Sequence, residues 1–503
     1  MEYLSKSKYC KGMQCPKILW LDKYNSEVAV DTAKQSVFEN GRKVGELARK
    51  LFGKFINIEY DKDLNVMIAN TQIALESGAK IITEASFNYN NNFCSVDILR
   101  LTDNGVEIYE VKSSSHIEQI YVEDVTYQCY ILTNLGYNVE KVSIVYLNRK
   151  YIRGEELELD KLFIIEDITD IALEKQLEVE KNIELINQVM EENKADSEPN
   201  IDISKNCTEP YLCKYWQYCT KDLPKPNVFD LSILGNKSKD IKFEKYYEGK
   251  VSFKDLQNED LQERALEQIK FEINNLEPRI DKEAIRGILD SLKYPLYFID
   301  YESYNTPIPE IIGTKPYQQL PFQYSLHIIK EEGAPVEHKE FLADCDDKDF
   351  IRHFAESMIK DMPENGSIII YSKAFEPARN REIANLYPDL KDELERMNKN
   401  MVDFLEPFKK RIYYCKEMNG SASIKAVLPA LYPDNPDLDY HNLSVVHNGD
   451  EASEAFLSLK GKTKEEQEEI RNGLLVYCEL DTYAMVKVWE KLKEVVEEWE
   501  KKK

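Results

Sequence analysis

Hydrophobic and polar residues alternate through residues 93–112, FCSVDILRLTDNGVEIYEVK, on both sides of the dipeptide Asn104-Gly105. Alternation of this kind predicts strands with one buried face, and an Asn-Gly pair between two such runs is typical of a two-residue hairpin loop. If Asn104 and Gly105 form the loop, Asp103 pairs with Val106. The segment is therefore predicted to be a β-hairpin.

Three charged side chains share one face of this predicted hairpin. The same register places Asp97 opposite Lys112, and Glu110 lies two residues before Lys112 on the same face, because side chains alternate along a strand. Two carboxylates this close repel each other and favour a bound cation. The lysine could orient a water molecule or stabilise charge that develops on a phosphate. A solvated hairpin face with an ion pair is the alternative interpretation.

A second series of apolar runs occupies the last part of the chain. YPLYFIDYES predicts a strand that carries Asp300 and Glu302 on one face. FQYSLHII predicts an antiparallel neighbour, and GSIIIYSKAFE predicts a third strand that ends at Phe375-Glu376. Two acids on a buried strand are costly without cations. This strand is therefore a second candidate metal site.

Helical periodicity appears in three other segments. GLLVYCELDTYAMVKVWEKL predicts a helix in which Tyr477 and Asp481, four residues apart, lie on one face. Residues 166–200 predict a charged helix that ends in the breaker-rich ADSEPN. Residues 220–285 alternate glycine turns with short helical periods. We interpret this last stretch as a connector, and a small helical DNA-contacting module is the alternative.

Composition limits the classes of protein to which the chain can belong. It has 503 residues, 43% of them hydrophobic, which is enough for two or three cores. The formal net charge of −25 argues against a protein that coats DNA by bulk electrostatics, but not against an enzyme that uses metal ions and local basic strips. No apolar run approaches the roughly 20 residues that span a bilayer, and the first residues lack a signal-peptide core. We expect a cytoplasmic protein that does not enter a membrane.

Ten cysteines in a chain expected to be cytoplasmic favour metal or cluster ligation over disulfides. Cys15 lies near the start, in QCPKILWLDKY, and five residues separate each successive pair of Cys207, Cys213 and Cys219. Zinc sites usually have closer cysteine pairs, whereas iron–sulfur clusters accept varied spacings and aromatic surroundings. Buried packing positions and a zinc site remain alternatives, and Cys10 competes with Cys15 for the ligand role.

The order Asp97…Glu110-x-Lys112 resembles the D…(D/E)-x-K signature of PD-(D/E)XK nucleases. With one cysteine before it and three after it, the region is similar to the RecB-like nucleases that hold a [4Fe–4S] cluster. Relatives of that group are the CRISPR-associated spacer-processing nucleases and the AddB-type helicase–nucleases. FENGRKVGELARKLF resembles the family's opening helix, EASF its Glu-bearing strand, and VTYQCYIL the helix after the lysine.

This resemblance implies Mg²⁺ or Mn²⁺ at Asp97 and Glu110, with Lys112 as a catalytic residue. It also implies a [4Fe–4S] cluster with four ligands, which are Cys15, Cys207, Cys213 and Cys219.

Two positions depart from that family. Its opening helix often has a metal-binding His, where this chain has a glycine followed by Glu46. Its Q-x3-Y pattern becomes Gln128 with Tyr127 and Tyr130 nearby. Glu46 or Glu84 could complete the metal shell, and each could equally be a surface carboxylate.

The last part of the chain resembles the RNase H-like DEDD exonucleases of the DnaQ type, in their tyrosine-bearing form. Asp300-x-Glu302 matches the first motif and Tyr477-x3-Asp481 the third. In that family four acids hold two divalent metals about 4 Å apart, and the tyrosine positions the attacking water.

The second motif of those exonucleases is altered in this chain. The family has Asn-x2-3-Phe-Asp, whereas Ser372 and Phe375-Glu376 stand here. Glu376 would be the metal ligand, although its extra methylene requires a shifted backbone. Asp403 matches a later Asp that is usually structural and is the reserve ligand. An RNase H-like domain retained for binding or architecture is the alternative.

The pairing of the two halves is similar to an uncharacterised bacterial family that joins them in one chain. We therefore expect an α/β protein with a PD-(D/E)XK, restriction-endonuclease-like domain at residues 1–222, a helical connector at 223–290 and an RNase H-like domain at 291–503. The resemblance implies a metal-dependent nuclease that hydrolyses DNA, from ends or on single strands, in repair, recombination or defence. An RNA-processing exonuclease and a nucleic-acid-binding cluster protein with an inactive RNase H-like domain are the alternatives.

Overall fold

The computed structural model describes residues 3–30, 35–435, 438, 440, 443 and 445–501. The protein is mixed α/β, which confirms the expected class at that level. It forms two compact units: unit 1 comprises Met1–Leu223 and Thr306–Gln318, and unit 2 comprises Pro224–Asn305 and Gln319–Lys503. Among the described residues, no helix combines the length and the apolar composition that crossing a membrane requires.

Unit 1 is built on a mixed sheet with strand order β2-β3-β4-β5-β6-β7 and with β1 beside β4. The strands are β1 (Leu4–Ser5), β2 (Ile56–Asn57), β3 (Ile81–Tyr89), β4 (Asn92–Leu101), β5 (Val106–Val111), β6 (Val139–Leu147) and β7 (Phe163–Asp167). Strands β3, β4 and β5 are antiparallel neighbours, and β5 runs parallel to β6. A parallel pair needs a long crossover, which helix α5 (Gln119–Asn134) supplies.

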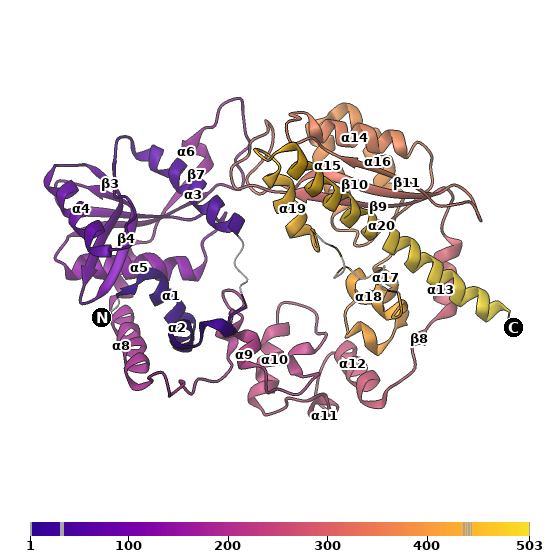
Figure 1. The fold of residues 1–503 in the computed structure, drawn as a ribbon, viewed down its shortest axis with the longest axis horizontal. Coiled ribbons are helices and arrows are strands. Elements are labelled where there is room, and N and C mark those ends of the chain that lie inside the picture. The colour runs from indigo at the N-terminus through magenta and orange to yellow at the C-terminus, as the bar shows by residue number, and fades with distance from the viewer. Residues whose placement is uncertain are drawn as a thin grey trace. The chain divides into compact units, whose positions relative to one another are not determined.

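Helices cover both faces of this sheet (Figure 1). The helices of unit 1 are α1 (Lys6–Gln14), α2 (Pro16–Tyr24), α3 (Gln35–Arg49), α4 (Leu64–Glu76), α5, α6 (Leu159–Leu162), α7 (Thr169–Glu174), α8 (Gln176–Glu192) and α9 (Trp216–Cys219). One core joins the sheet to α4, α5 and α8, and a second joins its other face to Val44 and Ala48 of α3. The charged helix expected within residues 166–200 is divided into α7 and α8.

The hairpin between β4 and β5 forms, but its register differs from the prediction. Leu101, not Asp103, pairs with Val106, so the connection is four residues long. The Thr102 hydroxyl accepts the Gly105 N–H at 2.9 Å and closes this loop. Gly105 is needed for space, since a Cβ there would lie 2.0 Å from the Asn138 carbonyl oxygen. The two-position shift keeps every side chain on its expected face, because strand side chains alternate.

Unit 2 contains a sheet with strand order β11-β10-β9-β12-β13. The strands of unit 2 are β8 (Arg279–Ile280), β9 (Leu296–Tyr304), β10 (Leu320–Ile329), β11 (Glu337–Leu342), β12 (Ser367–Ile370), β13 (Met401–Asp403) and β14 (Tyr413–Tyr414). β10 is antiparallel to β9, as expected, and to β11, whereas β12 and β13 continue the sheet in parallel with β9. β8 and β14 form a separate short pair.

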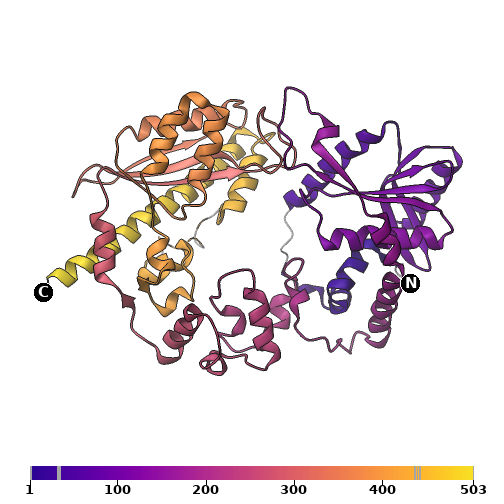
Figure 2. The same cartoon turned by 180° about the vertical axis from the view of Figure 1, so that it is seen from behind.

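The helices of unit 2 are α10 (Ser238–Tyr247), α11 (Phe253–Leu256), α12 (Glu263–Asn274), α13 (Lys282–Asp290), α14 (Phe350–Asp361), α15 (Glu376–Leu386), α16 (Lys391–Lys399), α17 (Glu406–Lys409), α18 (Ile424–Leu431), α19 (Gly449–Ser458) and α20 (Lys464–Glu500). Helices α14 and α20 lie on opposite faces of the five-stranded sheet (Figures 1 and 2). Alternation along β10 explains this arrangement: Tyr324 bonds Ser357 of α14, whereas Ser325 bonds Thr482 of α20.

The third strand predicted in unit 2 is shorter than expected. β12 ends at Ile370, and Glu376 begins helix α15 instead of ending a strand. The Asp403 carboxylate accepts the N–H groups of Ser372 at 3.0 Å and Lys373 at 2.8 Å, which turns the chain away from the sheet. Ser372 has a φ of 105°, a conformation that extended strand residues do not adopt.

The connection between β9 and β10 belongs to unit 1. Within Thr306–Gln318, the Thr314 carbonyl accepts the Arg153 N–H at 2.9 Å, and the Gly313 N–H donates to the Arg153 carbonyl at 2.8 Å. The Tyr317 hydroxyl donates to the Ser113 carbonyl, and Ile308 and Tyr317 pack against the core beneath α3. The chain therefore passes between the units at 223–224, 305–306 and 318–319.

Candidate active sites and cysteine group

The hairpin site consists of Asp97, Glu110 and Lys112. Asp97 lies on β4, Glu110 on β5, and Lys112 directly follows β5. The Lys112 ammonium is 2.7 Å from Glu110 Oε1, and the Val111 N–H donates to Asp97 Oδ2 at 2.8 Å. The structure thus brings the three predicted residues together. If the β4–β5 pairing is continued by one residue beyond Ile98 and Tyr109, Glu110 lies opposite Asp97, where the sequence had predicted Lys112.

Two further charged residues complete the hairpin site, and sequence reasoning missed both. The Lys6 ammonium, from the start of α1, lies 2.9 Å from Glu110 Oε1 and 3.7 Å from Asp124 Oδ1. Asp124 on α5 also binds Lys112. Gln128, one helical turn after Asp124, donates to Glu110 Oε2 at 2.7 Å. The spacing of Asp124 and Gln128 could have revealed a shared face, but nothing near Lys6 in the sequence indicates its partners.

The two carboxyls of the hairpin site differ in charge state. Burial would raise the pKa of Glu110, but the ammoniums of Lys112 and Lys6 outweigh it and hold that pKa well below its usual range. Burial and the neighbouring Glu110 carboxylate raise the pKa of Asp97 to about 7. Near neutral pH, Asp97 is therefore the carboxyl that a nearby cation would shift toward its ionised form.

An open cavity of about 640 Å³ adjoins the hairpin site. Asp97 and Glu110 line it together with Glu46 of α3 and Glu84 of β3. Glu84 has a φ of 57° and binds Arg49, whereas Glu46 is exposed and pairs with Arg42 at 3.1 Å. Oxygen ligands of this kind suit hard divalent cations such as Mg²⁺. Both acids that were candidates from the sequence thus share the cavity, and each already has an arginine partner.

Lys6 compensates buried negative charge, so we expect Lys6→Gln to destabilise unit 1 by about 2–3 kcal/mol. Hydrogen exchange of the β5 and α5 amides measures this loss locally. Lys80→Gln is the matched control, since the Lys80 side chain is 76% exposed. Equal exchange rates in the two variants would contradict the role of Lys6.

The buried acid site consists of Asp300, Glu302, Glu376 and Asp481. Asp300 and Glu302 lie on β9, Asp481 on α20, and Glu376 is the first residue of α15. Glu302, Glu376 and Asp481 are 6%, 2% and 9% exposed, whereas Asp300 is half-buried. The Oε2 atom of Glu376 is buried and, among the described residues, has no hydrogen-bond partner.

Burial raises the pKa values of all four carboxyls in the buried acid site, and the Asp481 carboxylate adds to the rise at Asp300 and Glu302. Burial and the Asp481 carboxylate raise the pKa of Asp300 and that of Glu302 well above their ordinary values. Burial raises the pKa of Glu376 to about 7 and that of Asp481 to about 6. Four neighbouring carboxyls cannot all be ionised without added positive charge. Divalent cations bound to their oxygens supply that charge.

A phenol and an ammonium border the buried acid site. The Tyr440 hydroxyl donates to Asp481 Oδ1 at 2.7 Å, and Tyr477 lies one helical turn before Asp481. The Lys425 ammonium lies 5.0 Å from the Tyr440 ring centre and 5.4 Å from that of Tyr477. Tyr440 and Lys425 were missed from the sequence, because neither lies in a recognisable motif. The carboxylate of Asp403, the reserve ligand, accepts the backbone N–H groups of Ser372, Lys373 and Leu405.

The cysteine group consists of Cys15, Cys207, Cys213 and Cys219. Cys15 separates α1 from α2, Cys207 ends a short turn of helix, and Cys219 ends α9. Burial and the neighbouring Cys207 and Cys213 thiols raise the pKa of Cys15, and burial with the other three cysteines raises that of Cys219 to about 11. The four thiols therefore share one region.

Hydrogen bonds tie the two chain segments of the cysteine group together. The Gln14 amide donates to the carbonyls of Asn206 at 2.8 Å and Tyr211 at 2.9 Å. Cys10 lies elsewhere, since Asp124 and Lys112 of the hairpin site influence its thiol. The structure therefore groups Cys15, and not Cys10, with the three later cysteines.

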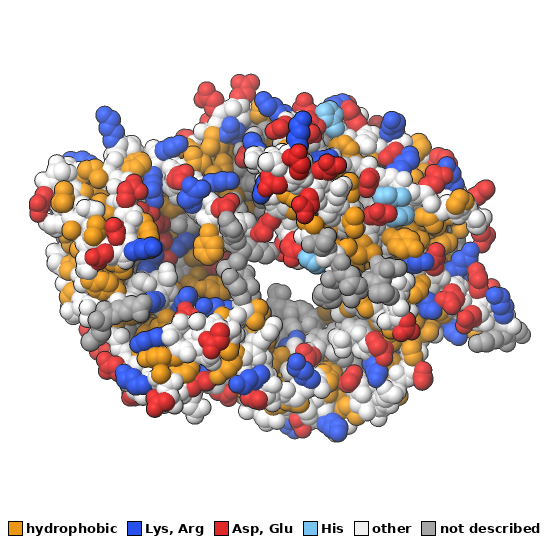
Figure 3. Space-filling view, in the orientation of Figure 1, with side chains coloured by type: hydrophobic (Ala, Val, Ile, Leu, Met, Phe, Trp, Pro, Cys, Tyr) orange, Lys and Arg blue, Asp and Glu red, His pale blue; other side chains and the backbone are white. Residues whose placement is uncertain are grey.

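Charged side chains of both signs are interspersed over the face drawn in Figure 3. With a net charge of −25, long-range attraction would not hold a nucleic acid at this protein. Any phosphate contact would depend on local ammoniums such as Lys6 and Lys112.

A family model described as a domain of unknown function (DUF2779) matches residues 297–423. The matched segment contains Asp300, Glu302, Glu376 and Asp403 but ends before Tyr477. The search of curated proteins and the search of solved structures found no match to this chain.

Proposed function

We propose that this protein is a metal-dependent nuclease that hydrolyses phosphodiester bonds, with DNA as the favoured substrate. The observation that carries the proposal is that Asp97 and Glu110 line one cavity, with the Lys112 ammonium paired to Glu110. The antiparallel β3-β4-β5 strands followed by α5 and a parallel β6 support a PD-(D/E)XK fold for unit 1.

The hairpin site fits a divalent cation held by Asp97 and Glu110, with Glu84 at the cavity wall. Mg²⁺ or Mn²⁺ would supply a Lewis acid that activates water. Lys112 is placed to stabilise charge that develops on the phosphate, since its ammonium borders Glu110. Lys6 and Gln128 fix the Glu110 carboxylate from the other side, which keeps it ionised and oriented.

The buried acid site supports a second hydrolytic centre of the RNase H-like, DEDD type in unit 2. The donor set of Asp300, Glu302, Glu376 and Asp481 fits two divalent cations, and the unpartnered Glu376 oxygen provides a free ligand position. The start of helix α15 at Glu376 changes the backbone path at the altered motif, which supports Glu376 as a ligand despite its extra methylene. Tyr477 would orient the attacking water.

The cysteine group supports a [4Fe–4S] cluster. A single zinc ion with bonds of about 2.3 Å would hold its sulfurs about 3.8 Å apart. Among the described residues, no three of these four sulfur atoms all lie within 4.8 Å of one another. The wider spacing favours a larger inorganic core, and the apolar surroundings of Ile18, Leu21 and Tyr215 suit it.

Protein purified without oxygen is expected to carry about four irons per chain and to absorb visible light, and Cys15→Ser should remove both. Elemental analysis and absorbance measure the change. Cys10→Ser is the matched control, because Cys10 lies five residues away but outside the cysteine group. Loss of iron in the control, or its retention in Cys15→Ser, would contradict the ligand assignment.

The nuclease proposal is tested with the full chain, purified without oxygen, on end-labelled single- and double-stranded DNA and on RNA of the same sequence. We expect DNA shortening that requires Mg²⁺ or Mn²⁺ and stops with chelator. The double variant Asp97→Asn, Asp300→Asn controls for contaminating nucleases. Faster cleavage of RNA would favour the RNA-processing alternative, and no cleavage by iron-bearing protein would favour a non-catalytic binding protein.

A further inference from the structure

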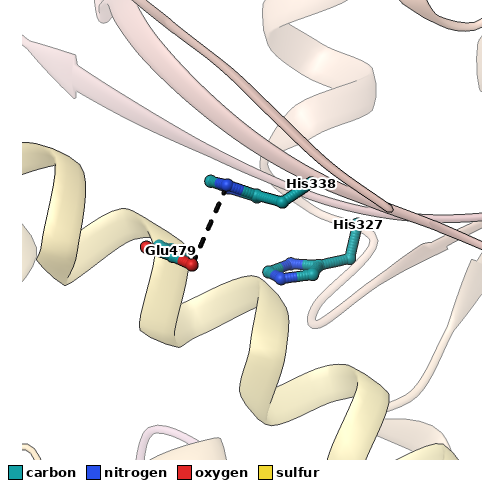
Figure 4. Close-up of side chains that lie close together, drawn as sticks. All are labelled: His327, His338 and Glu479. Carbon is teal, nitrogen blue, oxygen red and sulfur yellow. Dashed lines mark ion pairs between the residues drawn. The ribbon is translucent and has the colours of Figure 1, made fainter. Parts of the chain in front are cut away.

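Two histidines and a glutamate form a separate group of potential metal ligands in unit 2 (Figure 4). His327 on β10 and His338 on β11 are directly opposite each other in the strand register, with ring centres 4.6 Å apart. Glu479 projects from α20, and its Oε1 lies 3.8 Å from His338 Nδ1. One ligand atom of each residue lies within 4.8 Å of those of the other two.

A chain of hydrogen bonds determines which nitrogen of each ring carries its proton. Thr482 Oγ1 lies 3.0 Å from the Glu479 carbonyl oxygen, and since a carbonyl only accepts, the hydroxyl donates there. Thr482 Oγ1 therefore accepts from His327 Nδ1 at 2.9 Å and from Ser325 Oγ at 2.7 Å. The single hydroxyl proton of Ser325 is used in its bond to Thr482, so Ser325 Oγ accepts from His338 Nε2 at 2.9 Å.

This network leaves Nε2 of His327 and Nδ1 of His338 with free lone pairs. The Nδ1 lone pair of His338 faces the Glu479 carboxylate, which also only accepts. A metal cation bound between the two would satisfy both acceptors.

We propose that His327, His338 and Glu479 bind a divalent transition metal, with Zn²⁺ as the preferred ion. Two imidazoles and one carboxylate form a three-ligand zinc set that leaves a fourth position open. Ring N–H groups that donate to hydroxyls are the outer contacts that orient metal-binding histidines. Imidazole selects Zn²⁺ over Mg²⁺, whereas the all-oxygen buried acid site has the opposite preference.

The metal would join α20 to the edge of the sheet. Glu479 and Thr482 come from the helix that also carries Asp481, while the histidines come from β10 and β11. Ser325 pairs in register with Asp300, so the network adjoins the buried acid site on the same sheet face. The zinc site is thus a structural clamp beside that site, and its existence does not depend on nuclease activity.

Zinc binding is measured on the chelator-treated full chain, titrated with Zn²⁺ alone in excess Mg²⁺, with bound zinc counted by elemental analysis after desalting. We expect His338→Gln and Glu479→Gln each to bind one zinc fewer than wild type, and to lose the rise in melting temperature that zinc produces. Ser325→Ala should weaken this site about tenfold to hundredfold. His353→Gln is the matched control, since His353 lies on α14 and pairs with Asp347.

The cysteines are unchanged in all these variants, so zinc bound by them cancels in the comparison. Equal zinc stoichiometry and affinity in wild type, His338→Gln and Glu479→Gln would overturn the proposal. If His338→Gln does not fold, Glu479→Gln decides alone, because its side chain is 49% exposed and its loss leaves no cavity.

Discussion

Replacing Asp97 by asparagine is expected to reduce DNA cleavage at the hairpin site by on the order of 10³-fold or more, with the fold intact. An amide cannot supply the negative charge that holds a divalent cation. Its carbonyl oxygen can still accept the Val111 N–H, which Asp97 accepts at 2.8 Å. The substitution also removes a carboxyl that Glu110 repels, so stability should not fall.

Cleavage of end-labelled single-stranded DNA under single-turnover conditions measures this effect. Both proteins carry Asp300→Asn, so that only the hairpin site contributes. Asp103→Asn is the matched control, because Asp103 is on the same hairpin with a side chain that is 96% exposed. Wild-type rates in the Asp97 variant would remove the hairpin site from the catalytic assignment.

The metal-free protein is expected to lose stability as the pH rises from about 4.5 to 7, and Mg²⁺ or Mn²⁺ should restore it. The pKa of Glu376 is about 7 in the folded state against 4.5 as the ordinary value, and that of Asp481 is about 6 against 3.8. Because the pKa values of these two carboxyls are raised in the folded state, their contribution to the free energy of unfolding is fully present below the unfolded-state pKa values. That contribution is lost as the pH rises through the folded-state pKa values. For Glu376 alone, the loss is about 3 kcal/mol.

Thermal unfolding at several pH values, with chelator or with Mg²⁺, tests this dependence. Asp300→Asn should flatten the pH profile of the metal-free protein, because it removes a buried carboxyl whose own pKa is raised well above its ordinary value. Asp290→Asn, at the exposed end of α13, should leave the profile unchanged. A metal-free protein that becomes more stable between pH 5 and 7 would contradict the raised pKa values of Glu376 and Asp481.

Local patterns predicted most of the elements that carry these sites. Strands β9 and β10 and the helix with Tyr477 and Asp481 follow from apolar periodicity, which depends only on neighbouring residues. The β4–β5 register was wrong by two positions, yet the face of Asp97 was right, because a two-residue shift preserves alternation.

The missed features all depend on contacts between distant parts of the chain. Lys6 reaches Glu110 across 104 positions of sequence, and Tyr440 reaches Asp481 across 41. The early end of β12 is caused by Asp403, which no local pattern of Ser372 and its neighbours reveals. Charge compensation and strand termination of this kind are set by the tertiary structure.

The placement of Thr306–Gln318 in unit 1 has a consequence for how the gene can change. The flanking strands β9 and β10 belong to unit 2, and β9 carries Asp300 and Glu302. A gene fragment that stops after residue 223 would encode unit 1 without the segment that packs Ile308 and Tyr317 into it. Exchange of residues 1–223 alone would therefore remove part of the core of unit 1, and an insertion between β9 and β10 would alter a segment that packs in that core.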